Sequence, residues 1–336
     1  MALERCALVG CVLAVLILEP PACPSALQSI PDEPALTFSR VETLDLSPAT
    51  TSQLRQDLEV HDYVAAEKLL LPEIDHDPHS LHAAALLSFI GGVFYLNGDY
   101  FHAAVAWSKS QAIAPLNPEL KFSLAMTYIR MGHPDWARTA LLALAKDNPG
   151  DALYPYWLGR LDYDARTYSE AIGHFKAAIA LAPGMARAYD NLGLCYYHQN
   201  QNELAVESYQ KAIDLDRGSA QPSAWPYLNL AVTLRLMDQP IRAEANLQEA
   251  IRLDPNFAQA HFQLGNVLES TGQTDAAVSE FCDAARLDPG YAEPHFALAR
   301  LYRRLGRESA ARREVQTYLR LRARSGSENT ASDPHP

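Results

Sequence analysis

The stretch ARAYDNLGLCYYHQNQNELAVESYQKAIDLDR, residues 186–217, decides the fold of this chain. Apolar side chains recur three and four residues apart in two of its segments, 188–197 and 203–215. This spacing is typical of an amphipathic helix with one buried face. A short polar turn separates the segments, so the sequence predicts two antiparallel helices joined by a tight connection.

The same pattern recurs along the chain every 34 residues, with a single interval of 38 caused by four inserted residues, 220–223. When the repeats are aligned on one another, three positions hold residues of one kind in every repeat. The first holds only Gly or Ala: Gly91, Ala125, Gly159, Gly193, Ala231, Gly265 and Ala299. The second holds only Ala: Ala103, Ala137, Ala171, Ala205, Ala243, Ala277 and Ala311. The third holds large apolar residues: Trp107, Leu141, Phe175, Tyr209, Leu247, Phe281 and Val315. Small residues allow two helix backbones to approach closely, and large ones fill the space beside them.

These features resemble the tetratricopeptide repeat family, in which a Leu-Gly pair such as Leu192-Gly193 precedes an alanine, an aromatic residue and a closing proline. The resemblance implies an all-α, right-handed superhelical solenoid of antiparallel helix pairs. It also implies a concave groove that binds protein segments without chemistry. One pair cannot bury its apolar stripe alone, so the pairs are expected to stack on one another.

The sequence divides into five parts. Residues 1–25 are predicted to be a signal peptide, 26–46 a linker and 47–83 a degenerate capping helical unit, in which Ser47-Pro48 indicates a helix start. Residues 84–324 form seven repeats that begin at 84, 118, 152, 186, 224, 258 and 292. Residues 325–336 are expected to be a disordered tail.

The N-terminus carries an unbroken apolar run, residues 6–18, which as a helix would span about 20 Å, less than the ~30 Å of a membrane core. Small residues before a cut after Ser25 complete the layout of a signal peptide. We therefore expect a periplasmic or secreted protein. An uncleaved membrane anchor is the runner-up, and a lipidated Cys11 is a third reading. Membrane contact is expected only through such a leader or lipid.

A partner-binding site is expected on the first helix of the middle repeats. In the family, an asparagine before the Leu-Gly pair often holds a ligand backbone, and the resemblance places Asn191, Asn229 and Gln263 in that column. Amides donate and accept, so they suit any extended backbone. We expect them to be partly exposed; the alternative is that they are solvated or cap local backbone.

Aromatic and arginine side chains on the same helices extend this candidate site. Tyr156, Arg160, Tyr163 and Tyr197 fall in columns that the resemblance directs into the groove. Such residue types often dominate binding energy. The alternative is that the tyrosines are core residues at helical spacing.

Charge is unevenly distributed along the chain. The net charge of −12 disfavours generic binding to nucleic acid. Residues 292–324 nevertheless hold nine Arg against three Glu. Arg300, Arg303 and Arg304 therefore form a secondary basic patch, which is either a polar cap for solubility or a docking site for an acidic partner or anionic headgroups.

No catalytic motif, cofactor-binding motif or metal-ligand spacing is found, so no catalytic residue, cofactor or metal is expected. The sequence predicts a non-enzymatic scaffold that binds a protein or peptide. Two alternatives are a membrane-associated assembly factor that resembles outer-membrane repeat lipoproteins, and a remote relative of repeat-containing glycosyltransferases. The oligomeric state stays open.

Overall fold

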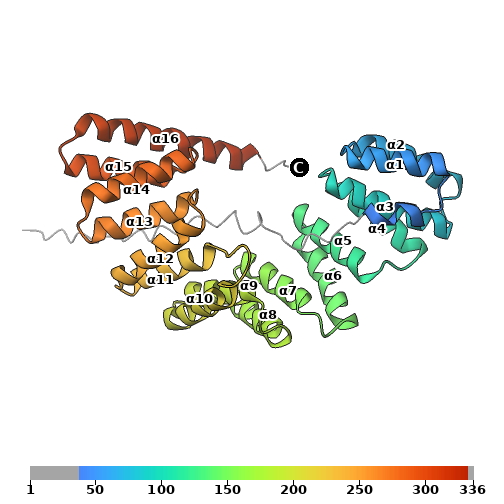
Figure 1. Cartoon of the computed structure of the whole chain (residues 1–336), viewed down its shortest axis with the longest axis horizontal. Coiled ribbons are helices and arrows are strands. Elements are labelled where there is room, and N and C mark those ends of the chain that lie inside the picture. The colour runs from blue at the N-terminus through green and yellow to red at the C-terminus, as the bar shows by residue number, and fades with distance from the viewer. Residues whose placement is uncertain (1–37, 332–336) are drawn as a thin grey trace, which may run out of the picture. The chain divides into compact units, whose positions relative to one another are not determined.

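The structure is a computed structural model that describes residues 38–331, with side chains described from 41 to 324. Within these residues it contains α-helices and one 3₁₀ helix, and no strand (Figure 1). The elements are η2 (Phe38–Thr43), α1 (Pro48–Glu59), α2 (Tyr63–His76), α3 (Leu81–Leu96), α4 (Tyr100–Ile113), α5 (Pro118–Arg130), α6 (Pro134–Asp147), α7 (Leu153–Asp164), α8 (Tyr168–Leu181), α9 (Ala186–His198), α10 (Asn202–Asp216), α11 (Trp225–Leu236), α12 (Pro240–Leu253), α13 (Ala258–Ser270), α14 (Thr274–Leu287), α15 (Ala292–Arg304) and α16 (Glu308–Ala331). The predicted all-α fold class is confirmed.

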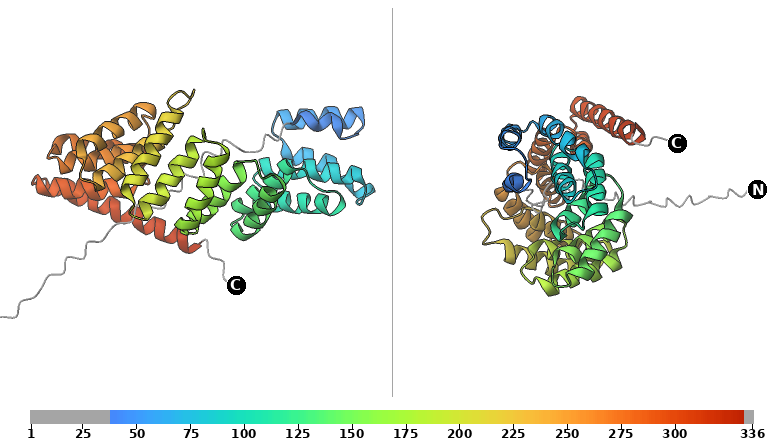
Figure 2. Two further views of the ribbon diagram at one scale, coloured as in Figure 1. Left: turned by 90° about the horizontal axis from the view of Figure 1, so that it is seen from below. Right: turned by 90° about the vertical axis from the view of Figure 1, so that its right-hand side faces the viewer.

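The chain divides inside α5 into two compact parts, residues 1–127 and 128–336. In the N-terminal part, α1 packs on α2, α2 on α3 and α3 on α4. In the C-terminal part, each helix from α6 to α15 packs on the one that follows it, and Figure 2 shows α13 to α16, orange to red, side by side as antiparallel pairs. The first helices of four successive repeats also contact one another in order: α7 contacts α9, α9 contacts α11, and α11 contacts α13. These first helices therefore form a continuous row.

The prediction that residues 26–46 form a linker is wrong for the last part of this stretch. Residues 38–43 form η2, which packs on α1, and Val41 and Leu44 are only 2% and 4% exposed. Leu44 directly follows η2 and its backbone N donates to the Val41 carbonyl at 3.2 Å, so the two apolar side chains, three residues apart, lie on the same side of this turn. Ser47 then caps α1 as predicted, accepting a hydrogen bond from Thr50 N at 3.1 Å. The predicted signal peptide and the linker up to residue 37 lie outside the described residues.

Two other boundaries differ from expectation. α3 begins at Leu81, ahead of the expected repeat start at 84, because the Ser80 hydroxyl accepts a hydrogen bond from Ala83 N at 3.0 Å and caps the helix there. The tail expected to be disordered from 325 is helical up to Ala331, the end of α16. No proline occurs between Glu308 and Ala331, so no residue of that type interrupts α16 before it ends.

Each glycine of the Gly/Ala column lies against the aromatic ring that follows sixteen residues later. A Cβ built on Gly265 would lie 2.6 Å from Phe281 Cε1, and one on Gly193 would lie 2.5 Å from Tyr209 Cε1. Where the C-terminal part has alanine in that column, the later residue is smaller: Leu247 follows Ala231, and Val315 follows Ala299. The column therefore holds glycine where a flat ring must lie directly on the helix backbone.

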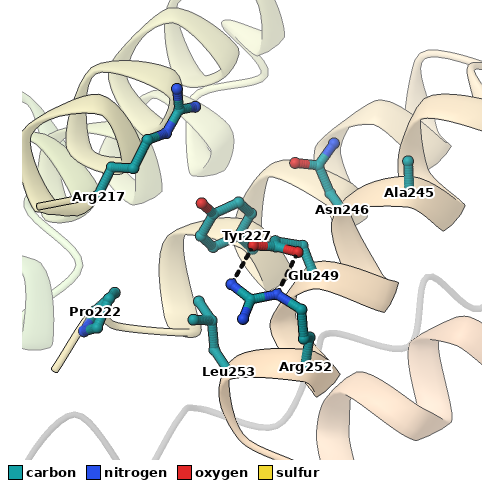
Figure 3. A pocket seen from close by; sticks show the side chains of 8 residues that line it. All are labelled: Arg217, Pro222, Tyr227, Ala245, Asn246, Glu249, Arg252 and Leu253. Atoms are coloured by element: carbon teal, nitrogen blue, oxygen red, sulfur yellow. Dashed lines mark hydrogen bonds and ion pairs between the residues drawn. The ribbon is translucent and has the colours of Figure 1, made fainter.

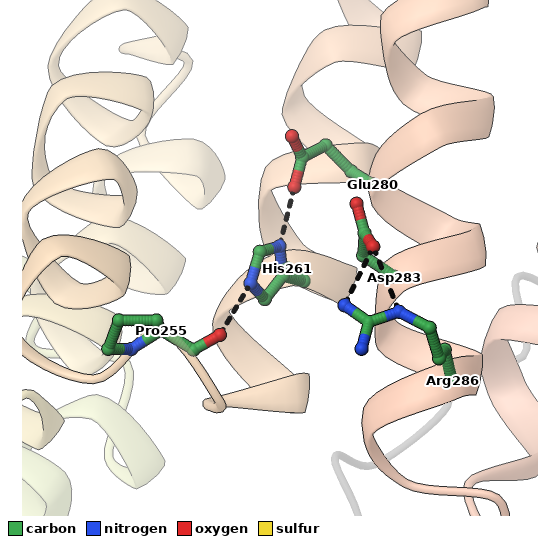
Figure 4. Close-up of polar contacts among 5 residues, drawn as sticks. All are labelled: Pro255, His261, Glu280, Asp283 and Arg286. Carbon is green, nitrogen blue, oxygen red and sulfur yellow. Dashed lines mark hydrogen bonds and ion pairs between the residues drawn. The ribbon is translucent and has the colours of Figure 1, made fainter.

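The last two helix pairs are also joined by a repeated polar contact. His261 Nδ1 on α13 lies 2.7 Å from Glu280 Oε2 on α14 (Figure 4). His295 Nδ1 on α15 lies at the same distance, 2.7 Å, from Glu314 Oε2 on α16. His261 Nε2 faces the Pro255 carbonyl at 3.3 Å, so both ring nitrogens meet acceptors. The hydrogen bond to Glu280 raises the pKa of His261 above its ordinary value. Each of these His–Glu contacts therefore connects the two helices of its repeat.

The glycine–ring contact predicts the outcome of a double-mutant cycle. Gly265→Ala gains up to about 1 kcal/mol of helix propensity, but its methyl group overlaps the fully buried Phe281 ring, and overpacking costs about 1–3 kcal/mol. We therefore expect a net loss of stability in chemical denaturation. In a Phe281→Leu background the same change should be neutral or stabilising, as the Ala231 and Leu247 pairing indicates. An equal effect of Gly265→Ala in both backgrounds would contradict the contact.

Candidate functional site

The row of first helices α7, α9 and α11 brings polar and aromatic side chains from three successive repeats together. We call this surface the first-helix face. Its residues are Arg160, Tyr163, Asp190, Tyr197, His198, Asn229 and Arg235.

The first connection across this face centres on Asp190. Asn229 Nδ2 on α11 donates a hydrogen bond of 3.0 Å to Asp190 Oδ1 on α9. The positive charge of Arg160 on α7 also acts on Asp190. Burial raises the pKa of Asp190 to about 6, against the lowering effects of Asn229 and Arg160. The carboxylate therefore links three repeats, yet it loses its proton less readily than an ordinary aspartate.

The second connection is aromatic. Tyr163 Oη on α7 lies 3.0 Å from His198 Nε2 on α9. The His198 ring stacks on Tyr168 of α8, with centroids 4.7 Å apart and an angle of 3° between the planes. Burial raises the pKa of Tyr197 on α9, and the nearby positive charge of Arg235 on α11 partly offsets this rise, so Arg235 belongs to the same row. Tyr163, Tyr197, His198 and Arg235 all keep part of their surface exposed.

The three predicted amides do not form one uniform run. Asn191 is 8% exposed, and its Nδ2 donates to the Arg187 carbonyl of its own helix at 2.8 Å. Expecting it to be partly exposed is therefore wrong, because a short amide side chain on a packed helix turns back to local backbone. Asn229 and Gln263 are partly exposed; Asn229 bonds Asp190, and Gln263 Oε1 accepts from Asn266 at 3.3 Å.

Two of the four predicted tyrosine and arginine residues are buried. Tyr156 is 5% exposed, and the Arg187 guanidinium lies over its ring at 4.7 Å. Arg160 is 6% exposed and lies over the Trp157 ring at 5.9 Å. Arg187, which lies over Tyr156, belongs to the next first helix, α9, whereas Trp157 belongs to the same helix as Arg160. Only Tyr163 and Tyr197 of this set present part of their surface to solvent.

The secondary basic patch is partly neutralised. Arg300 and Arg304 on α15 both form ion pairs with Glu269 on α13, which is mostly buried. Arg303 is exposed. Sequence reasoning did not single out Glu269, because it is 31 residues before Arg300 and only the packing of α13 against the next pair brings them together.

Among residues 38–331, no group of three or more His, Cys, Asp or Glu side chains is arranged to hold a metal ion. In the same residues, no helix is both long enough and apolar enough to cross a lipid bilayer.

Two tetratricopeptide repeat profiles match the sequence, one over residues 184–256 and the other over residues 122–186 and 237–292. Together they cover residues 122–292 without a gap, about half of the chain. The chain belongs to the tetratricopeptide repeat family.

Known proteins resemble this tetratricopeptide repeat protein over part of their length. Human protein O-mannosyl-transferase TMTC1 is 30% identical over 179 residues, 52% of this chain and 20% of that protein. BBSome complex member BBS4 of Xenopus tropicalis is 29% identical over 129 residues, 38% of this chain and 24% of that protein. The chain thus spans only about a fifth to a quarter of these curated relatives. A solved tetratricopeptide repeat protein from Parabacteroides merdae covers 81% of this chain and 98% of its own, with a TM-score of 0.59 and 15% identity, and shows the shared fold.

Three residues of the first-helix face were missed at the sequence level: Asp190, His198 and Arg235. A signal for them was present, since Asp190 lies one position before Asn191 in the repeat, and His198 and Arg235 lie at the ends of their first helices. Their importance in this tetratricopeptide repeat protein comes from contacts between repeats, which a single column does not report.

Asp190 predicts a pH-dependent difference in stability. The folded protein holds the proton of Asp190 more tightly than the unfolded chain does, so this proton stabilises the fold at low pH. That stabilisation is lost as the pH rises from about 4 to about 6. The raised pKa corresponds to at most about 3 kcal/mol. Asp190→Asn keeps an oxygen for Asn229 but never ionises, so its stability relative to the native protein should rise over this pH range and level off above it. Urea denaturation across the range measures this; parallel curves for the two proteins would exclude it.

Proposed function

We propose that this chain is a non-enzymatic interaction scaffold that holds an extended segment of a protein partner across the first-helix face. The observation that carries the proposal is the partly exposed, cross-connected set of Tyr163, Tyr197, His198 and Arg235 on successive repeats. Aromatic rings and arginines supply much of the binding energy in protein interfaces.

The contacts within this set support binding without a large ordering cost. His198 is held from two sides, by the stacked Tyr168 ring and by the Tyr163 hydroxyl. A side chain already fixed in one geometry loses little entropy when a partner binds. The aromatic part of the face is therefore prepared for contact, while Asn229 and Asp190 already satisfy each other and serve to hold the helices in place.

The relatives support a scaffold more directly than an enzyme. TMTC1 is named a mannosyltransferase, and the match covers a fifth of it. We infer that what this chain shares with TMTC1 and BBS4 is the repeat scaffold, and that its partner is a protein or peptide.

Selection of linear peptides from a displayed library against the full chain tests the proposal. Tyr163→Ala and Tyr197→Ala should each weaken selected peptides by about tenfold, the loss of roughly 1.4 kcal/mol of contact. Tyr63→Ala on α2, also partly exposed, is the matched control and should leave binding unchanged. The proposal fails if peptides bind equally well to the double variant at Tyr163 and Tyr197 while its fold, measured by circular dichroism, is intact.

We also propose that residues 1–25 direct export and are then removed, which rests on the apolar run and small residues near Ser25. N-terminal sequencing of the periplasmic or secreted protein should begin near Ala26. Palmitate labelling distinguishes the lipidated alternative, and a protein that keeps Met1 and stays in the cytosol would overturn the export proposal.

A further inference from the structure

The last helix pair, α15 and α16, exposes a face that the preceding pair turns toward the next helix. In the preceding pair, Cys282 of α14 faces α15, with its Sγ 3.9 Å from Tyr302 Oη. Gln316 lies 34 residues after Cys282 and occupies the same position on α16. Residues three and four positions before and after Gln316 lie on its side of the helix. We call this set the α16 face, and all its members are exposed: Arg312, Arg313, Gln316, Leu319 and Arg320.

Two apolar side chains at this end of the array are exposed where their equivalents in earlier repeats are covered. Ile213 of α10 occupies the position of Leu319 and is 2% exposed, whereas Leu319 is 58% exposed. Phe262 of α13 contacts the Tyr291 ring at the start of the next pair, with centroids 5.2 Å apart. Phe296, its equivalent on α15, is 47% exposed. Among the elements that the structure describes, none follows α16 to cover these side chains.

The arginines of the α16 face also differ from other arginines of the C-terminal part, which form ion pairs within the chain. Arg252 pairs with Glu249 at 2.6 Å, at the pocket beside the inserted loop (Figure 3). Arg286 pairs with Asp283 at 3.0 Å (Figure 4). Within the described part of the chain, three exposed arginines of the α16 face pair with no carboxylate: Arg312, Arg313 and Arg320. Their positive charges are therefore available to a partner.

The first helix pair of the chain carries a face of opposite charge. Val60 in the α1–α2 turn, and Val64 and Leu71 on α2, are exposed apolar side chains. Val64 and Leu71 are seven residues apart, so they lie on one side of the helix. Four carboxylates flank them in the sequence, against the single Lys68, and none forms an ion pair with another described residue: Glu59, Asp62, Glu67 and Asp75. We call these residues the α2 face.

We propose that the α2 face of one copy of this protein docks on the α16 face of a second copy. The unpaired arginines of one copy meet the carboxylates of the other, and the apolar side chains of the two faces cover one another. Two α16 faces repel each other, and so do two α2 faces, so the contact joins unlike surfaces. Each copy keeps one face of each kind, so association continues beyond two copies unless a ring closes.

A protein partner suits the α16 face better than an anionic membrane does. A helix that lies in the headgroup region needs a wide apolar side. Leu319 is the single apolar residue of the α16 face, and the other side of α16 packs on α15. The face therefore matches a surface that combines a few apolar side chains with carboxylates, as the α2 face does.

Sedimentation velocity of the full chain over a range of protein concentrations tests the proposal. At about 0.01 M salt the sedimentation coefficient should rise with protein concentration. At about 1 M salt, where the Debye length falls to about 3 Å, this rise should be much smaller, because the charges of the two faces are screened.

A charge exchange between the faces tests which residues make the contact. One variant combines Arg312→Glu, Arg313→Glu and Arg320→Glu, and the other combines Glu59→Lys, Glu67→Lys and Asp75→Lys. Each variant alone opposes like charges and should associate at least about tenfold more weakly than the native protein. An equal mixture of the two should associate again, because every contact between them joins unlike charges. This recovery also shows that both variants are folded.

The matched control reverses three exposed basic residues outside both faces, Lys146→Glu, Lys211→Glu and Arg242→Glu, and should associate like the native protein. The proposal is overturned by a native protein that stays monomeric at low salt, by a mixture that fails to recover, or by an equal loss in the control. Binding of a monomeric native protein to phosphatidylserine vesicles, lost in the arginine variant, would also overturn it.

This inference goes beyond the proposed peptide-binding function and shares no residue with the first-helix face. The double variant at Tyr163 and Tyr197 should therefore self-associate like the native protein. Conversely, both charge-exchange variants should still bind the selected peptides, so a failure of one proposal leaves the other standing.

Discussion

The direct contact of an aromatic ring with the backbone of a neighbouring helix sets the distance between the two helices of a repeat. At Gly265 and Gly193 no space remains for a single methyl group, so the ring itself acts as the spacer. Where the ring is replaced by a leucine or valine, alanine returns to the facing position, as at Ala231 and Ala299. In sequence, Ala125 and Leu141 follow the same rule. Since each helix pair of the C-terminal part stacks on the next, this spacing also fixes where the first helices of successive repeats meet there.

The positions of the first helices in turn determine which side chains a partner reaches. The row of α7, α9 and α11 brings Asp190 within reach of Asn229, and Tyr163 within reach of His198. Most polar groups on this face are therefore already bonded between repeats. A partner gains from the partly exposed rings and Arg235 more than from hydrogen bonds that would have to replace existing ones.

Periodicity predicted the helices well, because burial of a stripe every three or four residues is a property of sequence alone. Proline and small residues likewise indicated where repeats begin, as at Pro118 and Ala186. Side-chain exposure was predicted less well. Asn191 turned to its own backbone, and Arg160 lay along Trp157, outcomes that depend on rotamers and on the neighbouring repeat. The candidate site could be located to the correct helices, but its residues could be chosen only after the contacts between repeats were known.

A repeat array also makes departures from the pattern informative. The columns that hold His261 with Glu280, and His295 with Glu314, close the last two pairs in the same way. When the same contact occurs at equivalent positions of successive repeats, it indicates a role in the stability of the fold, since each copy joins its helices in the same way. At Tyr227 and Asn246, which occupy the positions of His261 and Glu280 one repeat earlier, that contact is absent, and the inserted loop is nevertheless held by two hydrogen bonds to Asp216. The opening at these two residues (Figure 3) lies beside an insertion found at one repeat junction, and it marks a position where the stacking of helix pairs does not by itself determine the local structure.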